Sequence, residues 1–178
     1  MTITPDDKDW TWVLERPCPD CGLDTRAVDP AEVAGMVREV VVSWRAVLAA
    51  PADEVGRRPS PEKWSTLEYG CHVRDVFRLY DERLRLMLNE TDPLFANWDQ
   101  DATAVEDEYA AQNPVFVAQE LVEAGTALAE SFESVKGDEW HRTGARSDGA
   151  TFTVATFARY FVHDPIHHLY DVTGVRAT

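Results

Sequence analysis

Four stretches of this chain open with a helix-start signal and continue with apolar residues at helical spacing. In chain order the signals are Asp29-Pro30, Ser65 with Glu68, Asn113-Pro114, and Thr151 or Thr153. A side-chain oxygen just before a helix accepts a free N–H of the first turn, and proline is tolerated at the first helical position. The pattern predicts an all-α fold, an antiparallel four-helix bundle.

Breaks between these stretches set the expected boundaries. Pro51 follows the first helix, the second runs from about 66 to 88, the third ends near 135, and Gly174 closes the last. Residues 94–112 are acidic, with a short helix expected over 102–111. The first 28 residues lack a helical period, so we expect an irregular N-terminal arm over 1–28, carrying a Cys-x2-Cys turn, and a bundle over 29–178.

The chain is acidic, with 17 basic against 32 acidic residues and a formal charge of −15. Such a surface repels phosphate backbones and anionic bilayers, which argues against nucleic-acid and membrane partners. No apolar run reaches the roughly 18 residues of a membrane span, and the first residues do not resemble a signal segment. We therefore expect a cytoplasmic protein, a monomer or a homodimer.

Three of the five histidines lie within six residues near the C-terminus. His163 and His167 are four positions apart, so on a helix they stand on one face and form a clamp for a divalent metal. The second expected helix offers a third ligand, because His72 lies on its apolar side. His168 is about 100° round from His167, which makes it a backup ligand or a surface group.

Pro165 falls between the two histidines of the clamp. An interior proline removes a backbone donor and disfavours the preceding turn, so the helix could end near Val162. The apolar pattern nevertheless continues through Ile166, Leu169 and Tyr170. We therefore predict a helix that continues past Pro165, kinked at the proposed ligands.

These features resemble the DinB-like metalloprotein superfamily over about residues 30–175. The motifs that match are Trp64-Ser65-x2-Glu68-x3-His72 on an early helix and His163-x3-His167 on a late one. The resemblance implies a four-helix bundle with a metal held by His72, His163 and His167. Relatives include mycothiol-dependent maleylpyruvate isomerases and metal-dependent thiol S-transferases, while many members have no known activity.

Three imidazoles and one open position are typical of a catalytic zinc site, although nickel, iron, cobalt or manganese also accept nitrogen ligands. A thiol bound at the open position would ionise and become a nucleophile. The expected function is a metal-dependent thiol S-transferase or isomerase that uses mycothiol or another small thiol and an electrophilic substrate. The alternative is a non-catalytic metal-binding bundle acting in stress response or small-ligand binding.

Five further side chains could support the metal: Glu68, Asp75, Asp171, Tyr160 and Tyr170. The two aspartates follow predicted ligands by three or four positions, so each could orient an imidazole through its second nitrogen. The glutamate could be a fourth ligand or an acid/base, although helix capping already explains it. The tyrosines flank the histidine pair and could pack there or position a substrate.

Cys18 and Cys21, in Cys-Pro-Asp-Cys-Gly, look like one half of a zinc-ribbon knuckle. A structural zinc site needs four ligands, and no second Cys-x2-Cys follows. Three interpretations stay open: a reduced structural turn, a reversible disulfide, or a share in a metal site. Cys71 is expected to be buried in its helix.

Overall fold

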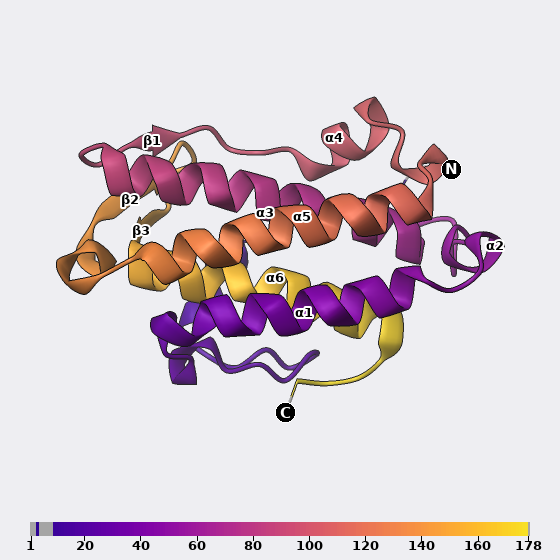
Figure 1. Cartoon of the computed structure of the whole chain (residues 1–178), viewed down its shortest axis with the longest axis horizontal. Coiled ribbons are helices and arrows are strands. Elements are labelled where there is room, and N and C mark those ends of the chain that lie inside the picture. Colours follow the sequence, from indigo (N-terminus) through magenta and orange to yellow (C-terminus); the bar gives the residue numbers. More distant parts are fainter. Residues whose placement is uncertain (1–2, 4–8, 178) are drawn as a thin grey trace.

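The computed structural model describes residue 3 and residues 9–177, and most of them are helical (Figure 1). The α-helices are α1 (Val33–Leu48), α2 (Ala52–Val55), α3 (Thr66–Asn89), α4 (Gln100–Glu106), α5 (Pro114–Ser134) and α6 (Val154–Thr173). Each predicted start signal forms: Asp29, Ser65, Asn113 and Thr153 all accept a backbone N–H at the head of a helical segment. The prediction of a four-helix bundle is confirmed.

The bundle consists of α1, α3, α5 and α6. Helix α5 packs between α1 and α3 on one side, and α6 lies against the same two helices on the other. Arg38 near the start of α1 pairs with Glu133 near the end of α5, so these two helices are antiparallel. Rings of α3 and α6 also pair in antiparallel order, Phe77 with Phe161 and Tyr80 with Phe157.

Helices α3 and α5 run in the same direction, and so do α1 and α6 (Figure 1). Arg74 binds Glu120 and Asp81 binds Ser131, so the contacts between α3 and α5 advance together along both helices. The reason is the long connection between them, which returns along the length of the bundle. Of the four pairs of neighbouring helices, only α1 with α5 and α3 with α6 are therefore antiparallel. Helix-start signals do not show in which direction neighbouring helices run.

Aromatic side chains fill the centre of the bundle. Phe161 of α6 stacks on Phe132 of α5 at 5.7 Å between ring centroids, and Tyr80 of α3 lies 4.9 Å from Phe161. Helix α5 comes close to its neighbours at Gly125, where an added Cβ would meet Val41 and would lie 2.9 Å from the ring of Phe77. Packing at this density makes α3 and α6 stiff supports for the groups they carry.

Two connections differ from the sequence prediction. A small sheet joins β1 (Leu94–Phe95), β2 (Thr143–Arg146) and β3 (Thr151–Thr153), with β1 parallel and β3 antiparallel to β2. The helix expected over 102–111 is instead α4 followed by a 3₁₀ turn, Tyr109–Ala111. Strands of two to four residues are too short to show an alternating pattern, which is why the sequence did not indicate them.

Helix α6 continues through Pro165 to Thr173, as predicted. The indole nitrogen of Trp44 on α1 donates a hydrogen bond of 3.1 Å to the carbonyl oxygen of Pro165. Gly174 ends the helix in the left-handed conformation, at φ +71°. Residues 163–168 thus lie on one helix, and their spacing decides which side chains share a face.

The described part of the N-terminal arm lies against α6. It forms 3₁₀ turns at Trp10–Leu14 and Thr25–Ala27 and buries Val13, Cys18 and Cys21. These side chains are as buried as those of the bundle, so the arm contributes to the core. A division of the chain at residue 28 stays a prediction. No helix among the described residues combines the length and apolarity needed to cross a bilayer.

Candidate metal centres on helix α6

Helix α6 presents potential metal ligands on two neighbouring faces. His163 and His167 share one face, and Asp164 and His168 share the next, about 100° round the helix. Each pair meets partners from another part of the chain. The closed group is Cys18, Cys21, His163 and His167, and the open group is His72, Asp164 and His168. Within each group, one ligand atom per residue lies within 4.8 Å of all the others.

The open group joins α3 to α6. The Nε2 atom of His72 lies 3.4 Å from Oδ1 of Asp164, and Nε2 of His168 lies 3.8 Å from Oδ2 of the same carboxylate. Two ligands about 2.0–2.2 Å from a tetrahedral metal lie about 3.4 Å apart. The observed spacing therefore fits a metal held by two imidazoles and one carboxylate after small side-chain shifts.

Neighbouring side chains hold these imidazoles in place. The ring of Trp98 stacks on His72 at 5.3 Å with an interplanar angle of 12°, and Trp64 lies at the same distance. Asp171 hydrogen-bonds Nδ1 of His168 at 2.9 Å, which leaves Nε2 of that ring facing Asp164. Metal-bound histidines usually have such a partner on the second nitrogen, because it fixes the ring and the tautomer.

Charges around the open group keep Asp164 ionised. Burial opposes ionisation, but His72 and His168 outweigh it and lower the pKa of Asp164 to about 2. Nδ1 of His72 and Oδ1 of Asp164 are buried and have no hydrogen-bond partner among the described residues. Buried polar atoms without partners are uncommon, and a ligand or ion often explains them.

A cavity of about 500 Å³ adjoins both groups. The groups supply His163, Asp164, His167 and His168 to its wall, and the rest of the wall includes Trp10, Tyr80, Arg83, Trp98, Arg146 and Tyr160. Its size lies in the range of small-molecule sites. A metal at the open group would therefore border space large enough for a substrate.

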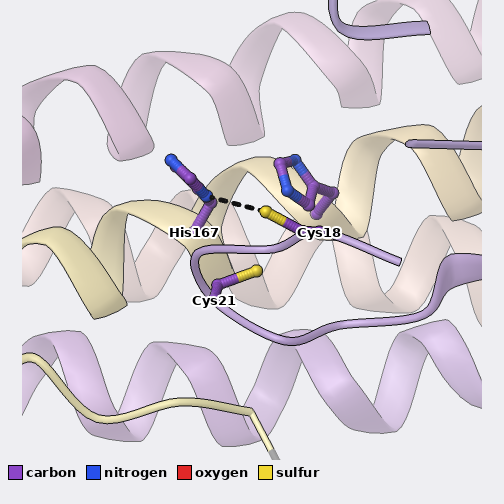
Figure 2. Close-up of side chains that lie close together, drawn as sticks. Cys18, Cys21 and His167 are labelled. Atoms are coloured by element: carbon purple, nitrogen blue, oxygen red, sulfur yellow. Dashed lines mark hydrogen bonds between the residues drawn. The ribbon is translucent and has the colours of Figure 1, made fainter. Parts of the chain in front are cut away.

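The closed group joins the N-terminal arm to α6. Cys18 and Cys21 lie on the loop of the arm, and Sγ of Cys18 points toward His167, 3.5 Å from its Nδ1 (Figure 2). All four members of the group are buried, and both cysteines are free thiols. The ring of Trp10 covers both histidines at centroid distances of 5.5 and 5.1 Å.

Burial also sets the protonation of the closed group. Desolvation, together with the neighbouring His167, lowers the pKa of His163 to about 4. Desolvation likewise lowers the pKa of His167 and raises the pKa of Cys21 to about 12. The imidazoles are therefore neutral at pH 7, the form that binds metals.

The three histidines predicted as one ligand set fall into different groups. His163 and His167 lie together, with ring centroids 4.9 Å apart, but His72 lies with Asp164 and His168. Whether any metal joins His72 to His163 and His167 stays a prediction. The signal for the other pairing was present, because Asp164 and His168 have the same four-residue spacing. The position of α3 decides between the two faces.

The predicted supporting residues have the following partners. Glu68 caps α3 through Ser65 and accepts hydrogen bonds from Arg58. Asp75 accepts hydrogen bonds from Arg74, Arg78 and Tyr109, and in the described part of the chain no hydrogen bond joins it to His72. Asp171 binds His168 and lies 3.8 Å from His167, beyond hydrogen-bond range. Tyr160 accepts from Arg146 at the cavity wall, and the ring of Tyr170 lies 6.4 Å from His167.

Comparison with known proteins agrees with this architecture. The family model described as the DinB superfamily matches residues 36–172. No curated protein matches the chain. Among solved structures, this chain is similar to YfiT from Bacillus subtilis, described as a probable metal-dependent hydrolase with an unusual four-helix bundle topology. The two share 15% sequence identity and superpose with a TM-score of 0.66, over 97% of this chain and 91% of YfiT. The family match begins within α1 and ends within α6, and the chain belongs to the DinB superfamily.

Proposed function

We propose that this protein is a metal-dependent enzyme acting on small molecules, with the metal bound by the open group. The observation behind this proposal is a set of three convergent ligands, His72, Asp164 and His168, beside a cavity of about 500 Å³. Three protein ligands and a free position distinguish catalytic zinc sites from structural ones. The description of YfiT as a probable metal-dependent hydrolase agrees with this class.

The donor set suits several divalent metals. Two imidazoles and a carboxylate bind catalytic zinc and also ferrous iron, and nickel, cobalt and manganese accept the same atoms. Zinc is our first choice. When bound, such a metal would lower the pKa of a water or thiol at its free position. The protein's own part is to hold the ligands: Trp98 stacks on His72, and Asp171 orients His168.

Five aspartates line the cavity along with Arg83 and Arg146, and Arg146 is paired with Asp148. Arg83 is the side chain of this wall that would suit an anionic group on a substrate. Arg83 is 4% exposed, lines the cavity, and has no carboxylate within ion-pair range among the described residues. One guanidinium nitrogen donates to the carbonyl oxygen of Ala96, while its Nε is buried with no partner in the described part of the chain. The guanidinium lies over the ring of Phe95 at 4.9 Å and over that of Tyr80 at 5.8 Å, contacts that stabilise the cation without balancing its charge. A carboxylate or similar anion in the cavity would balance it.

The finer proposal is a thiol S-transferase or isomerase that uses a low-molecular-weight thiol such as mycothiol. It rests on the resemblance of the histidine motifs to thiol-dependent members of the superfamily. A soft thiolate would compete well for a free position on zinc. Hydrolysis, with water in place of the thiol, is the second candidate, because YfiT is so described. A metal kept only for stability or ligand binding is the third.

A cobalt-loaded sample separates these candidates. Adding mycothiol, cysteine or coenzyme A should produce a new sulfur-to-cobalt charge-transfer band in the difference spectrum, with proton release as the thiol ionises. Release of thioether product from an electrophile should follow in the same sample. No new band with any thiol at millimolar concentration would contradict thiol chemistry and leave hydrolysis of an ester and amide panel as the test of catalysis.

A matched pair of variants tests the ligand assignment. His168→Ala should abolish the thiol-induced band and lower metal affinity at the open group by about tenfold or more, while His163→Ala should retain the band. The reverse result would favour the set His72, His163 and His167. For the anion site, Arg83→Gln should weaken binding of malonate about 10–100-fold, and malonamide should bind poorly to the unaltered protein.

A further inference from the structure

We infer that the closed group is a second metal site, a structural zinc centre formed by Cys18, Cys21, His163 and His167. Its four ligands come from two distant parts of the chain, the N-terminal arm and α6. Two thiolates and two imidazoles make a complete tetrahedral shell, which leaves no position for a substrate. The inference is independent of the function proposed for the open group.

The first half of the site is a tight turn that brings two sulfurs to one side. The amide of Gly22 donates to the carbonyl oxygen of Cys18 at 3.0 Å, and the amide of Cys18 donates to that of Leu23 at 2.9 Å. Gly22 has φ +86°, a conformation that other residues rarely adopt. The motif that looked like half of a zinc knuckle thus folds into a closed turn, with both thiols buried.

The second half is the histidine pair of α6. Structural zinc sites commonly combine Cys-x2-Cys with His-x3-His, which is the ligand spacing found here. The two halves lie far apart in the sequence, since Cys18 and His167 are 149 positions apart. The missing second half of the knuckle is therefore a pair of histidines from a distant helix.

The distances fit zinc. Sulfur and nitrogen ligands at about 2.3 and 2.0–2.1 Å from a tetrahedral metal lie about 3.5 Å apart. Sγ of Cys18 and Nδ1 of His167 are separated by 3.5 Å (Figure 2). One ligand atom from each of the four residues lies within 4.8 Å of the others. Side-chain shifts of about an ångström would complete the shell.

No other use of these side chains is evident in the described part of the chain. Nε2 of His163 is buried there without a hydrogen-bond partner, and the two cysteines are not joined in a disulfide. Trp10 packs over both histidines, and Trp12 packs over His163. A buried pair of thiols beside two imidazoles, one of them without a hydrogen-bond partner in this part of the chain, is suited to binding a cation.

The position of the site indicates what it stabilises. It would tie the arm to α6 beside Asp164 and His168 of the open group. The C-terminal segment also binds the turn, because the amide of Ala177 donates to the carbonyl oxygen of Cys21 at 2.8 Å and Arg176 donates to that of Pro19 at 2.9 Å. A zinc ion here would therefore fasten the Cys18–Cys21 turn, and through it residues 176 and 177, to the helix that carries the open group.

Cobalt spectroscopy of the full chain tests the site without an activity assay. Titration of metal-free, reduced protein with cobalt should give tetrahedral visible bands and a sulfur-to-cobalt charge-transfer band before any thiol is added. The double variant Cys18→Ser/Cys21→Ser should lose the charge-transfer band. Cys71→Ser is the matched control and should keep it, because Cys71 is buried in α3 near Tyr109 and Gln112.

A band that persists in the double variant, or none in the unaltered protein, would overturn the inference. If Cys18→Ser/Cys21→Ser fails to fold, the variant His72→Ala/His168→Ala tests the inference instead, because it removes two ligands of the open group only. Loaded with zinc, this variant should retain about one metal per chain, with an X-ray absorption spectrum that fits two sulfur and two imidazole ligands. A shell of nitrogen and oxygen alone would contradict the inference, whatever the outcome for the proposed enzyme.

Discussion

The closed and open groups occupy adjacent faces of the same helix, yet they differ in the properties that decide what a metal does. The closed group has four ligands, two of them sulfur, and all are buried. The open group has three candidate ligands, none of them sulfur, and the side chain of Asp164 is 32% exposed. A complete shell of four buried ligands is suited to stability, whereas a shell of three ligands that leaves a position free is suited to chemistry.

The largest effect is expected from the closed group. Cys18→Ser/Cys21→Ser should remove the contribution of zinc binding to stability, about 4 kcal/mol at a free zinc concentration 1,000 times the dissociation constant. For a chain of this size that corresponds to a melting temperature lower by about 8–16 °C. Differential scanning calorimetry with and without zinc measures it. An unchanged melting temperature that still responds to zinc would assign the stabilising metal to the open group.

Acid should destabilise the metal-free protein through the closed group. Because burial lowers the pKa of His163 to about 4 from 6.5, the unfolded chain binds a proton between these values that the folded chain does not. Stability is therefore present above pH 6.5 and is lost as the pH falls toward 4, by up to about 3 kcal/mol. Across this window, the unfolding free energy measured by urea denaturation should depend less steeply on pH in His163→Gln than in the unaltered protein. Equal slopes would mean that His163 is accessible to protons in the folded state.

Loss of the partner of His168 should affect the open group alone. Asp171→Asn removes the carboxylate that orients Nδ1 of His168, so metal affinity at the open group should fall about 10–100-fold. The sulfur-to-cobalt band of the closed group should remain, because Asp171 lies beyond hydrogen-bond range of His167. Competition titration with a chelator gives both affinities in one sample. Equal losses at both groups would show that the two sites are coupled through this turn of α6.

The smallest effects are expected from the two tyrosines near the histidines. Tyr160→Phe removes an acceptor of Arg146 at the cavity wall and should cost about 0.5–1.5 kcal/mol of unfolding free energy. Tyr170→Phe, beside the closed group, should change stability by less than about 0.5 kcal/mol. Chemical denaturation of both variants measures these changes in unfolding free energy. A larger cost for Tyr170→Phe would assign its hydroxyl a structural role near His167.

Much of the fold was predictable because its signals are local. Ser65 and Glu68 form the expected capping box, Asn113 caps a helix that begins with Pro114, and Gly174 ends α6. Capping and helical period depend on neighbours within a few positions, so a single sequence displays them. The direction of α3 relative to α5 depends on a connection that includes only short elements, and no local pattern records how it crosses the bundle.

The candidate ligands were largely visible in the sequence, but their grouping was not. His72, His163 and His167 are all buried among potential ligands, as their spacing suggested. Asp164 with His168 has the same spacing as His163 with His167, and both pairs suit a metal equally well on an isolated helix. The Cys-x2-Cys turn seemed incomplete because its counterpart is 149 positions away.

The sequence by itself determined the four helices, the inward position of His72 and the presence of two i, i+4 ligand pairs on the last helix. Only the tertiary structure decided that α3 meets the face of Asp164 and His168 while the N-terminal arm meets that of His163 and His167. The physical reason is geometric. A helix fixes which residues share a face, but the packing of distant segments determines what each face meets, and a rotation of about 100° separates the two faces.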